Sequence, residues 1–245
     1  MNKLGVCRMS VLDNSQNNFM NGIENLRDML DDFDLDAWRY LFVIHKFGIE
    51  EITTKLNILN EEYDYLHAYN PIEHLETRIK TPEKTVEKLI RQGFEVSPES
   101  AKKNLHDIGG IRIVCSFVED IYVIYENLCR QTDLKIVGVK DYIKNPKPNG
   151  YRSLHLLVEV PVFLTDRVEQ VVIEVQIRTI AMDFWASLEH KIYYKKKCTP
   201  QPEIVADLTE CADLAALLDK KMQRIKYQIE PHLTKEILLN NSKEN

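Results

Sequence analysis

Hydrophobic residues recur at alternating steps of three and four in two long segments, one near each end of the chain. Such steps are typical of an apolar stripe along one face of an α-helix. Gly48 lies inside the first stripe and predicts a weak point in that helix, which Asn70-Pro71 ends. The two stripes consist of Phe42, His45, Ile49, Ile52, Leu56, Leu59, Tyr63 and Leu66, and of Ile204, Leu208, Cys211, Ala215, Leu218, Met222, Ile225 and Ile229. Each stripe must be covered by the same chain or by a second subunit, and the pattern allows both.

The segment between the stripes alternates short apolar runs with amphipathic ones. The runs GIRIVCSF, LKIVGVKDYI, SLHLLVEVPV and QVVIEVQIRT predict strands, and EDIYVIYENLCRQ and IAMDFWASLEHKIYYKK predict helices. A further helix is expected over TPEKTVEKLIRQG, with Thr81 as its N-cap, Pro82 in the first turn and Gly93 after its end. The pattern therefore predicts an α/β (α+β) fold, in which a mixed β-sheet of four to five strands is flanked by helices.

These patterns divide the chain into five expected segments. Residues 1–18 are expected to form a flexible N-terminus and residues 19–70 an N-terminal helical region. Residues 71–198 hold the α/β domain, residues 199–232 a C-terminal helix, and residues 233–245 a flexible tail. The two helical regions are thus extensions of one central domain, which suits a chain of 245 residues.

Composition narrows the setting in which this domain works. The net charge of −6 means that any anion-binding site must be a local concentration of cations. The five cysteines are odd in number and form no CxxC or Cys/His ligand spacing, which argues for a reducing compartment and against a disulfide scaffold or zinc finger. No apolar run is long enough to cross a bilayer, and the first residues lack the apolar core of a signal peptide. A cytoplasmic location is therefore expected.

The last expected strand, within residues 170–179, has two different faces. Alternation places Val171, Ile173, Val175 and Ile177 on one face. The other face presents Glu174, Gln176 and Arg178 in a row. This polar row fits either a functional site or the solvated face of an antiparallel sheet.

A second polar group precedes the first expected strand. Asp107 stands before Gly109 and Gly110, and Arg112 lies inside the apolar run that follows. Burying an arginine without a partner is costly, so Arg112 needs a ligand or a structural ion pair. Two basic segments accompany these carboxylates, and they contain Arg78, Lys80, Lys84 and Lys88, and Lys140, Lys144, Lys147, Arg152 and His155 around Tyr151.

Together these residues suit metal-assisted phosphoryl transfer. Carboxylate oxygens are ligands for Mg²⁺, cations neutralise phosphate, and aromatic and guanidinium planes stack on bases. Glu83 and Glu87 have the same spacing as Lys84 and Lys88, so a merely solvated charged helix face also fits that segment. A P-loop and a protein-kinase signature are both absent from the sequence.

The motifs HDIGGIRIVC, KPNGYRSLH and EVQIRTIAMDFWASLEHKIYYK, in this order, resemble the synthetase domain of the RelA/SpoT family. The resemblance covers roughly residues 36–230 and is closest to small alarmone synthetases of the RelP type. It implies a nucleotidyltransferase-like fold and a Mg²⁺-dependent reaction. In that reaction the β,γ-pyrophosphate of ATP moves to the ribose 3′-hydroxyl of GTP or GDP, which gives AMP and pppGpp or ppGpp. It also implies a homotetramer.

The resemblance also implies roles for individual residues. Asp107 and Glu174 match the metal-binding carboxylates, and Glu174 also activates the 3′-hydroxyl. For ATP, the implied residues are Arg78 and Arg112 around adenine and Lys80 and Lys88 on the phosphates. For GTP or GDP, they are Tyr151 stacked on guanine, the loop residues Lys140, Lys147, Arg152 and His155, and Gln176 near the ribose.

Two positions need a separate comment. Asp183 is expected near guanine, where a carboxylate accepts from N1–H and the 2-amino group, although it would also suit the first turn of a helix without any ligand. The family usually has a serine at the position of Lys84, and here either Lys84 or the neighbouring Thr85 is expected to contact ATP phosphate.

Three functions remain open at this point. The first is a GTP pyrophosphokinase, and the second is a pyrophosphokinase that acts on the tRNA 3′ end or on an adenine nucleotide. The third is a catalytically silent RNA-binding module. Asp183 and the tyrosine-containing loop favour a guanine nucleotide, and the presence of both Asp107 and Glu174 argues against the silent module. RNA binding is not otherwise indicated by the acidic chain.

Overall fold

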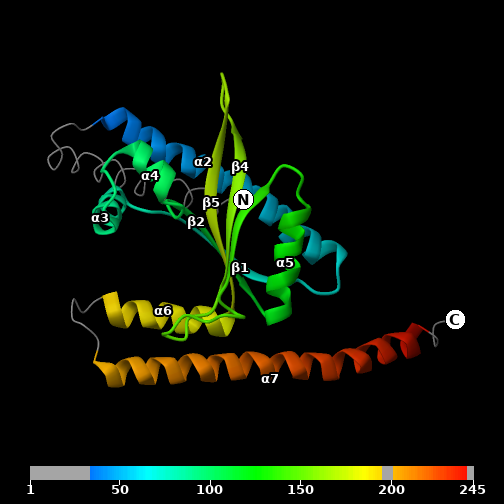
Figure 1. Cartoon of the computed structure of the whole chain (residues 1–245). Helices are drawn as coiled ribbons and strands as arrows, with labels where there is room; N and C mark the ends of the chain where they lie inside the picture. Colours follow the sequence, from blue (N-terminus) through cyan, green and yellow to red (C-terminus); the bar gives the residue numbers. More distant parts are fainter. Residues whose placement is uncertain (1–33, 195–200, 242–245) are drawn as a thin grey trace, which may run out of the picture.

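The structure, a computed structural model, describes residues 34–194 and 201–241. Its strands form one sheet in the order β1-β2-β5-β4-β3 (Figure 1). They are β1 (Ile72–Ile79), β2 (Gly109–Cys115), β3 (Lys135–Asp141), β4 (Leu154–Phe163) and β5 (Val168–Thr179). Only β2 and β5 pair in parallel, and the other neighbours are antiparallel, so the predicted mixed sheet of the α+β class is confirmed.

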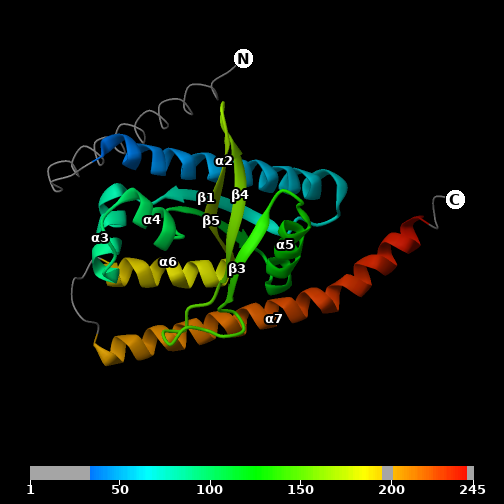
Figure 2. The same cartoon turned by 45° about the horizontal axis from the view of Figure 1, so that its top comes forward.

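Helices cover the sheet on both sides. They are α2 (Leu35–Leu66), α3 (Pro82–Gln92), α4 (Pro98–Asn104), α5 (Val118–Arg130), α6 (Ile180–Tyr194) and α7 (Pro202–Asn241). Figures 1 and 2 show α2 on one side of the sheet and α6 with α7 on the other. The expected helix at residues 81–93 is confirmed as α3, because Thr81 caps its first turn and Gly93 ends it at a φ of 72°.

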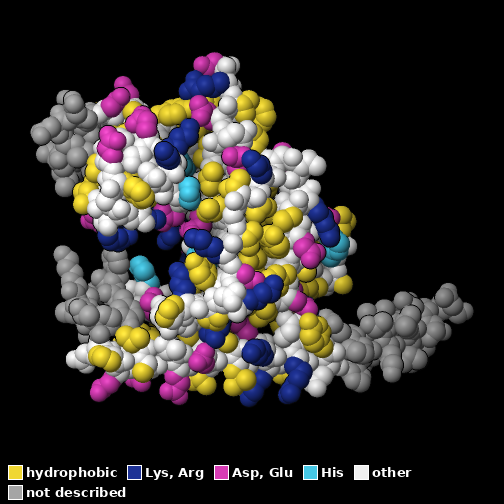
Figure 3. Space-filling model, viewed as in Figure 1, with side chains coloured by type: hydrophobic (Ala, Val, Ile, Leu, Met, Phe, Trp, Pro, Cys, Tyr) yellow, Lys and Arg dark blue, Asp and Glu magenta, His cyan; other side chains and the backbone are white. Residues whose placement is uncertain are grey.

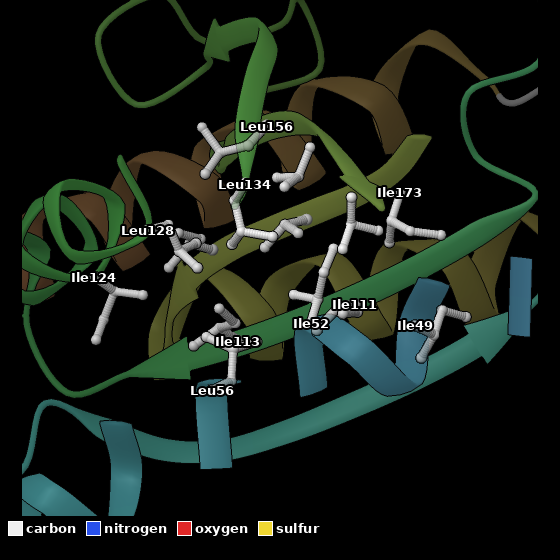
Figure 4. Packing of buried hydrophobic residues seen from close by; sticks show 14 of the residues in the cluster. Ile49, Ile52, Leu56, Ile111, Ile113, Ile124, Leu128, Leu134, Leu156 and Ile173 are labelled. Carbon is white, nitrogen blue, oxygen red and sulfur yellow. The ribbon is translucent and has the colours of Figure 1, made fainter. Parts of the chain in front are cut away.

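The main core lies between α2, α5 and the apolar face of the sheet (Figure 4). Ile52 on α2 and Ile173 on β5 are fully buried there. The stripe on α2 therefore packs on its own chain, as one of the two sequence-based alternatives expected. Gly48 does not break this helix, which is continuous from Leu35 to Leu66. A Cβ at Gly48 would lie 3.2 Å from Ile173 Cδ1, so the glycine lets α2 approach β5 closely.

The second stripe behaves differently. On α7 the side chains that face the protein include Ala212 and Asp219, one position after the predicted stripe residues Cys211 and Leu218. Leu218 is 53% exposed in the single chain. The predicted stripe is therefore largely uncovered by the described part of its own chain.

Some of the expected segments extend beyond the described residues. The flexible N-terminus at residues 1–18 lies outside the described residues, and so do residues 19–33 of the expected helical region. Helix α7 passes the predicted end at residue 232 and continues to Asn241, so residues 233–241 are helical rather than part of a flexible tail. Within the described residues, no helix has the length and apolar character needed to cross a membrane.

Candidate active site

The polar face of the sheet brings together residues from distant parts of the chain. Gly110 on β2 pairs with Glu174 on β5, and Arg112 pairs with Gln176. On the next strand His155 pairs with the same Gln176. Residues that pair directly project from the same side of a sheet, so Glu174, Gln176, Arg112 and His155 form one continuous polar surface.

This surface forms the floor of a cleft of about 600 Å³, with α6 on its other side. Figure 3 shows a hollow between the region of α3 and α4 and that of α6, with lysine and arginine side chains at its rim. The predicted site residues that line the cleft are Arg78, Arg112, Tyr151, Glu174, Gln176 and Asp183. The polar row on β5 is therefore part of a cleft and not an open solvated face.

Asp107 lies close to the end of β1 and the start of β2, outside the residues that line the cleft. The backbone N–H of Lys80 donates to Ile108 O at 2.8 Å, which places Lys80 beside the residue that precedes β2. Lys80 Nζ and Lys88 Nζ donate to the two oxygens of Asp107 at 2.6 and 2.7 Å. Burial raises the pKa of Asp107, but the two lysines outweigh it, so this pKa lies below its ordinary value. Asp107 is thus an ionised carboxylate between two cations.

Glu174 lies at the centre of the floor. Its Oε1 is 3.2 Å from His155 Nδ1, and its Oε2 accepts from Gln176 Nε2 at 2.8 Å. Burial and the charge of Asp107 raise the pKa of Glu174, whereas His155 and Gln176 lower it more, so the pKa lies below its ordinary value. The side chain is therefore ionised at neutral pH and placed to accept a proton or bind a cation.

The two arginines expected around adenine are both in the cleft. Arg78 is exposed on β1 and passes over Gly110, whose missing Cβ would lie 3.5 Å from Arg78 Nε. Arg112 forms ion pairs with Glu76 and, at 3.2 Å, with Asp183. A guanidinium plane can stack on a base, and both arginines line the same cleft, where carboxylates hold Arg112 in this structure.

The tyrosine expected under guanine is held from two sides. Tyr151 Oη is 2.7 Å from His155 Nε2 and accepts from Arg178 Nη2 at 2.7 Å. Burial raises the pKa of Tyr151, and the charge of Arg178 partly offsets this effect. The loop that carries Tyr151 turns at Gly150, which has a φ of 85°, a conformation that favours glycine.

Two predicted site residues are placed elsewhere. Thr85 is fully buried and its hydroxyl donates to Thr81 O, because it lies on the inner side of α3. Arg152 donates to Ala212 O and pairs with Asp213 at 2.9 Å, so it fastens the loop to α7. In this structure both side chains are engaged in these contacts and do not line the cleft.

The remaining lysines lie at the edges of the site. Lys84 is exposed on α3, one turn before Lys88. Lys147 lies over the rings of Tyr142 and Tyr151, at 4.7 and 4.8 Å from their centroids. Lys140 on β3 lies opposite His155 on β4 in the backbone register, and its side chain is exposed. All of these can extend the cationic surface towards a long phosphate chain.

Several cleft residues were not among the predicted site residues. They are Glu76, Arg178, Ser187, Glu189, His190 and Lys191. The alternation on β5 places Arg178 on the polar face, and that signal was sufficient to include it. The residues on α6 had no comparable signal, because only the fold brings this helix over the sheet.

These observations define an α+β protein with a cationic cleft and two ionised carboxylates. Residues 77–199 match the family model described as a region found in RelA / SpoT proteins. The chain is 50% identical over 196 residues to the GTP pyrophosphokinase YwaC of Bacillus subtilis, which covers 80% of this chain and 93% of that relative. The chain therefore belongs to the RelA/SpoT family and is a small alarmone synthetase by this kinship.

Solved structures agree with this assignment. The small alarmone synthetase 2 from Bacillus subtilis matches with a TM-score of 0.71 at 50% identity, over 78% of this chain and 98% of that one. The small alarmone synthetase 1 from the same organism, bound to its product pppGpp, matches with a TM-score of 0.74 at 33% identity, over 78% and 97%. The predicted family is confirmed.

Proposed function

We propose that this chain is a GTP pyrophosphokinase that transfers the β,γ-pyrophosphate of ATP to the ribose 3′-hydroxyl of GTP or GDP. The observation that carries the proposal is that ionised Glu174 shares one cleft with the arginine pair and Tyr151. Relatives that carry the name GTP pyrophosphokinase share 50% and 33% identity with the chain. Solved relatives bound to pppGpp and to AMPCPP support nucleotides as ligands.

The donor ATP binds on the side of β1 and α3. Arg78 and Arg112 hold the adenine ring, and for Arg112 this requires release from Asp183. The cations for the phosphates are Lys80, Lys84 and Lys88. Binding of a triphosphate gives Lys80 and Lys88 a second anion besides Asp107, and charge-assisted contacts of this type are among the stronger hydrogen bonds.

The acceptor nucleotide binds on the side of β4 and α6. Tyr151 stacks on guanine and Asp183 accepts from its N–H donors, which adenine does not present as a pair. Lys140 and Lys147 hold the phosphates, His155 orients Tyr151 and Glu174 beside the acceptor, and Gln176 contacts the ribose. Glu174 then accepts the proton of the 3′-hydroxyl as the oxygen attacks the β-phosphorus of ATP, and AMP leaves.

The site suits Mg²⁺ held by Asp107 and Glu174. Both side chains are ionised, because their hydrogen-bond partners hold the pKa of each below its ordinary value. No group of three or more His, Cys, Asp or Glu side chains that could hold a metal occurs among residues 34–194 and 201–241. Mg²⁺ is usually bound by one or two carboxylates together with substrate phosphates, and Asp107 and Glu174 would supply the carboxylates. When bound, the ion neutralises charge on the transferred phosphates.

The assembly is proposed to be a homotetramer in the cytoplasm. A groove of about 650 Å³ lies between α6 and α7, lined mainly by apolar side chains such as Phe184, Leu214 and Met222. Since the predicted stripe on α7 is largely exposed in the single chain, contact between subunits there would bury it. Size-exclusion chromatography with light scattering measures this directly.

A single assay tests the proposed reaction. ATP and Mg²⁺ are incubated with GTP, GDP, further ATP or tRNA as the acceptor, and the products are separated by charge. Formation of pppGpp and ppGpp with AMP is expected. Label on tRNA or adenine nucleotide alone would replace the proposed acceptor, and no product with any acceptor would favour a silent binding module.

A further inference from the structure

Arg178 is a buried cation in the middle of the proposed acceptor site. It projects from β5, is 7% exposed, and lines the cleft. Its Nη1 donates to Asp183 at 3.1 Å, and its Nη2 donates both to Tyr151 Oη and to Gln176 Oε1 at 2.7 Å. One guanidinium therefore contacts three side chains to which the proposed function assigns the base and ribose of the acceptor.

These contacts are part of a closed ring of hydrogen bonds. From Arg178 one arm runs through Gln176 to Glu174 Oε2, and the other runs through Tyr151 and His155 to Glu174 Oε1. Both arms begin at the same nitrogen of Arg178 and end on the two oxygens of one carboxylate. A change at Arg178 can thus reach Glu174 by two routes.

The chemistry of arginine decides how the ring is oriented. A guanidinium only donates hydrogen bonds, so Gln176 must turn its Oε1 towards Arg178 and its Nε2 towards Glu174. Without Arg178, the amide could rotate and place its oxygen against the carboxylate. In the same way, the Tyr151 oxygen accepts from Arg178, which leaves its hydrogen for His155. The ring therefore has one consistent direction from Arg178 to Glu174.

We infer that Arg178 is a positioning residue, which holds the tyrosine platform, the guanine-binding carboxylate and the catalytic glutamate in one fixed arrangement. The inference rests on the proposed function, because it takes the roles of Tyr151, Asp183 and Glu174 from there.

The arrangement carries a cost in stability. Arg178 Nε is buried and has no hydrogen-bond partner in the described part of the chain. A buried donor left without a partner is unfavourable. Lysine would keep the charge, but its compact ammonium cannot reproduce the planar fork.

The test compares Arg178→Lys and Arg178→Ala with Arg167→Ala. Arg167 is an exposed arginine that precedes the other end of β5 and pairs with Asp166 and Glu169, so it is a matched control. Kinetic constants are measured for ATP and for GTP separately, and GDP binding is measured by calorimetry without ATP. Unfolding midpoints report the folded fraction of each variant.

For both Arg178 variants we expect the KM for GTP to rise about tenfold or more and kcat to fall, with the KM for ATP within about twofold, since hydrogen bonds to charged groups are lost. GDP binding weakens in parallel. Low concentrations of guanidinium chloride restore part of the activity of Arg178→Ala, whereas sodium chloride at the same concentration does not. Guanidinium chloride does not increase the activity of the control variant Arg167→Ala. Arg167→Ala behaves as the unchanged protein.

Other outcomes overturn the inference. An unchanged KM for GTP together with unchanged GDP binding would do so. An equal rise in the KM for ATP and for GTP would also do so, if activity follows the folded fraction and guanidinium chloride does not restore it. If Arg178→Ala does not fold, Tyr151→Phe removes one arm of the ring and keeps the ring face, and an unchanged KM for GTP then contradicts the inference. An inactive unchanged protein would instead refute the proposed reaction, while GDP binding by the variants still decides the role of Arg178.

Discussion

The two faces of the central sheet are built from the same strands but carry opposite chemistry. On β5, Ile173, Val175 and Ile177 are fully buried against helices. Between them Glu174, Gln176 and Arg178 project into the cleft. The buried face is held by hydrophobic contacts, which have no preferred direction. The face at the cleft is held by hydrogen bonds, which are directional and form a closed ring. Alternation along a strand therefore separates core residues from cleft residues at single-residue spacing.

The difference has a consequence for mutations. Substitutions on the apolar face are expected to change the free energy of unfolding, because they alter packing. Substitutions on the polar face are expected to change kinetic constants, because they alter the contacts of substrates. The predictions that follow test this separation, in order of decreasing effect.

The largest effect is expected for Glu174→Gln. An amide cannot accept the hydroxyl proton, and general-base catalysis typically contributes about 10²–10⁴-fold, so kcat should fall by about that factor. The unfolding midpoint should stay near that of the unchanged protein. Initial rates of AMP formation measure the first quantity. Glu159→Gln on β4, whose glutamate pairs with Lys135 at 3.2 Å, serves as the control and should keep full activity. Normal turnover by Glu174→Gln would contradict the assigned role.

On the opposite face, Ile173→Ala should act on stability. Removal of a buried isoleucine side chain costs about 2–5 kcal/mol in the free energy of unfolding, measured by urea denaturation. Activity per folded molecule should remain within about twofold, because the side chain points away from the cleft. Val139→Ala, at a 46% exposed position on β3, should change stability little. Equal losses of catalysis and stability in Ile173→Ala would show that the two faces are not separable.

Tyr151→Ala should have an intermediate effect, which is a weaker binding of the acceptor nucleotide. Stacking of a base on an aromatic ring is worth about 1–3 kcal/mol, which corresponds to a rise of about 5–150-fold in the KM for GTP. The KM for ATP should change much less, because Tyr151 belongs to the proposed acceptor site and not to the proposed ATP site. Steady-state kinetics with each nucleotide varied in turn gives both values. An unchanged KM for GTP would show that guanine does not stack there.

The smallest effect is expected where α7 joins the sheet. Asp219 accepts from Thr179 Oγ1 at 2.7 Å, and burial raises its pKa. A folded-state pKa above that of the unfolded chain means that ionised Asp219 lowers stability at neutral pH, and that this cost disappears as the pH falls towards the ordinary carboxyl range.

Asp219→Asn should therefore be equally or slightly more stable than the unchanged protein at pH 7, by less than about 1 kcal/mol. The difference should shrink as the pH is lowered. Urea unfolding at several pH values measures it. A variant that is less stable at pH 7 and gains relative stability in acid would mean that the pKa is lowered and not raised.

The elements with strong periodicity were predictable from the sequence. Strands β2, β4 and β5 contain continuous or alternating apolar residues, and α3 carries its cap signals Thr81 and Gly93. Strand β1 was missed because most of its side chains are exposed at the sheet edge, which leaves no apolar pattern. Helix α4 has only Ala101 fully buried, and a short helix of this kind gives a weak signal.

The site was predictable where the family motifs or the strand alternation fixed a residue's direction. Glu174, Gln176 and Tyr151 came from such signals and do line the cleft. Thr85 and Arg152 did not reach it, because helix orientation and loop docking depend on contacts that sequence spacing does not contain. The ring that links Arg178 to Glu174 likewise joins side chains from β4, β5 and the preceding loop.

The most direct test of the proposed reaction uses ATP labelled at the β-phosphate, with GTP and Mg²⁺, in a single turnover. The account predicts that the label appears at the 3′ position of a guanosine nucleotide with an equal amount of AMP, and that Glu174→Gln forms almost none. Formation of ADP with an unlabelled guanosine product would mean transfer of a single phosphoryl group, and label that stays in adenine nucleotides would mean no transfer to guanosine. Either result would contradict the account.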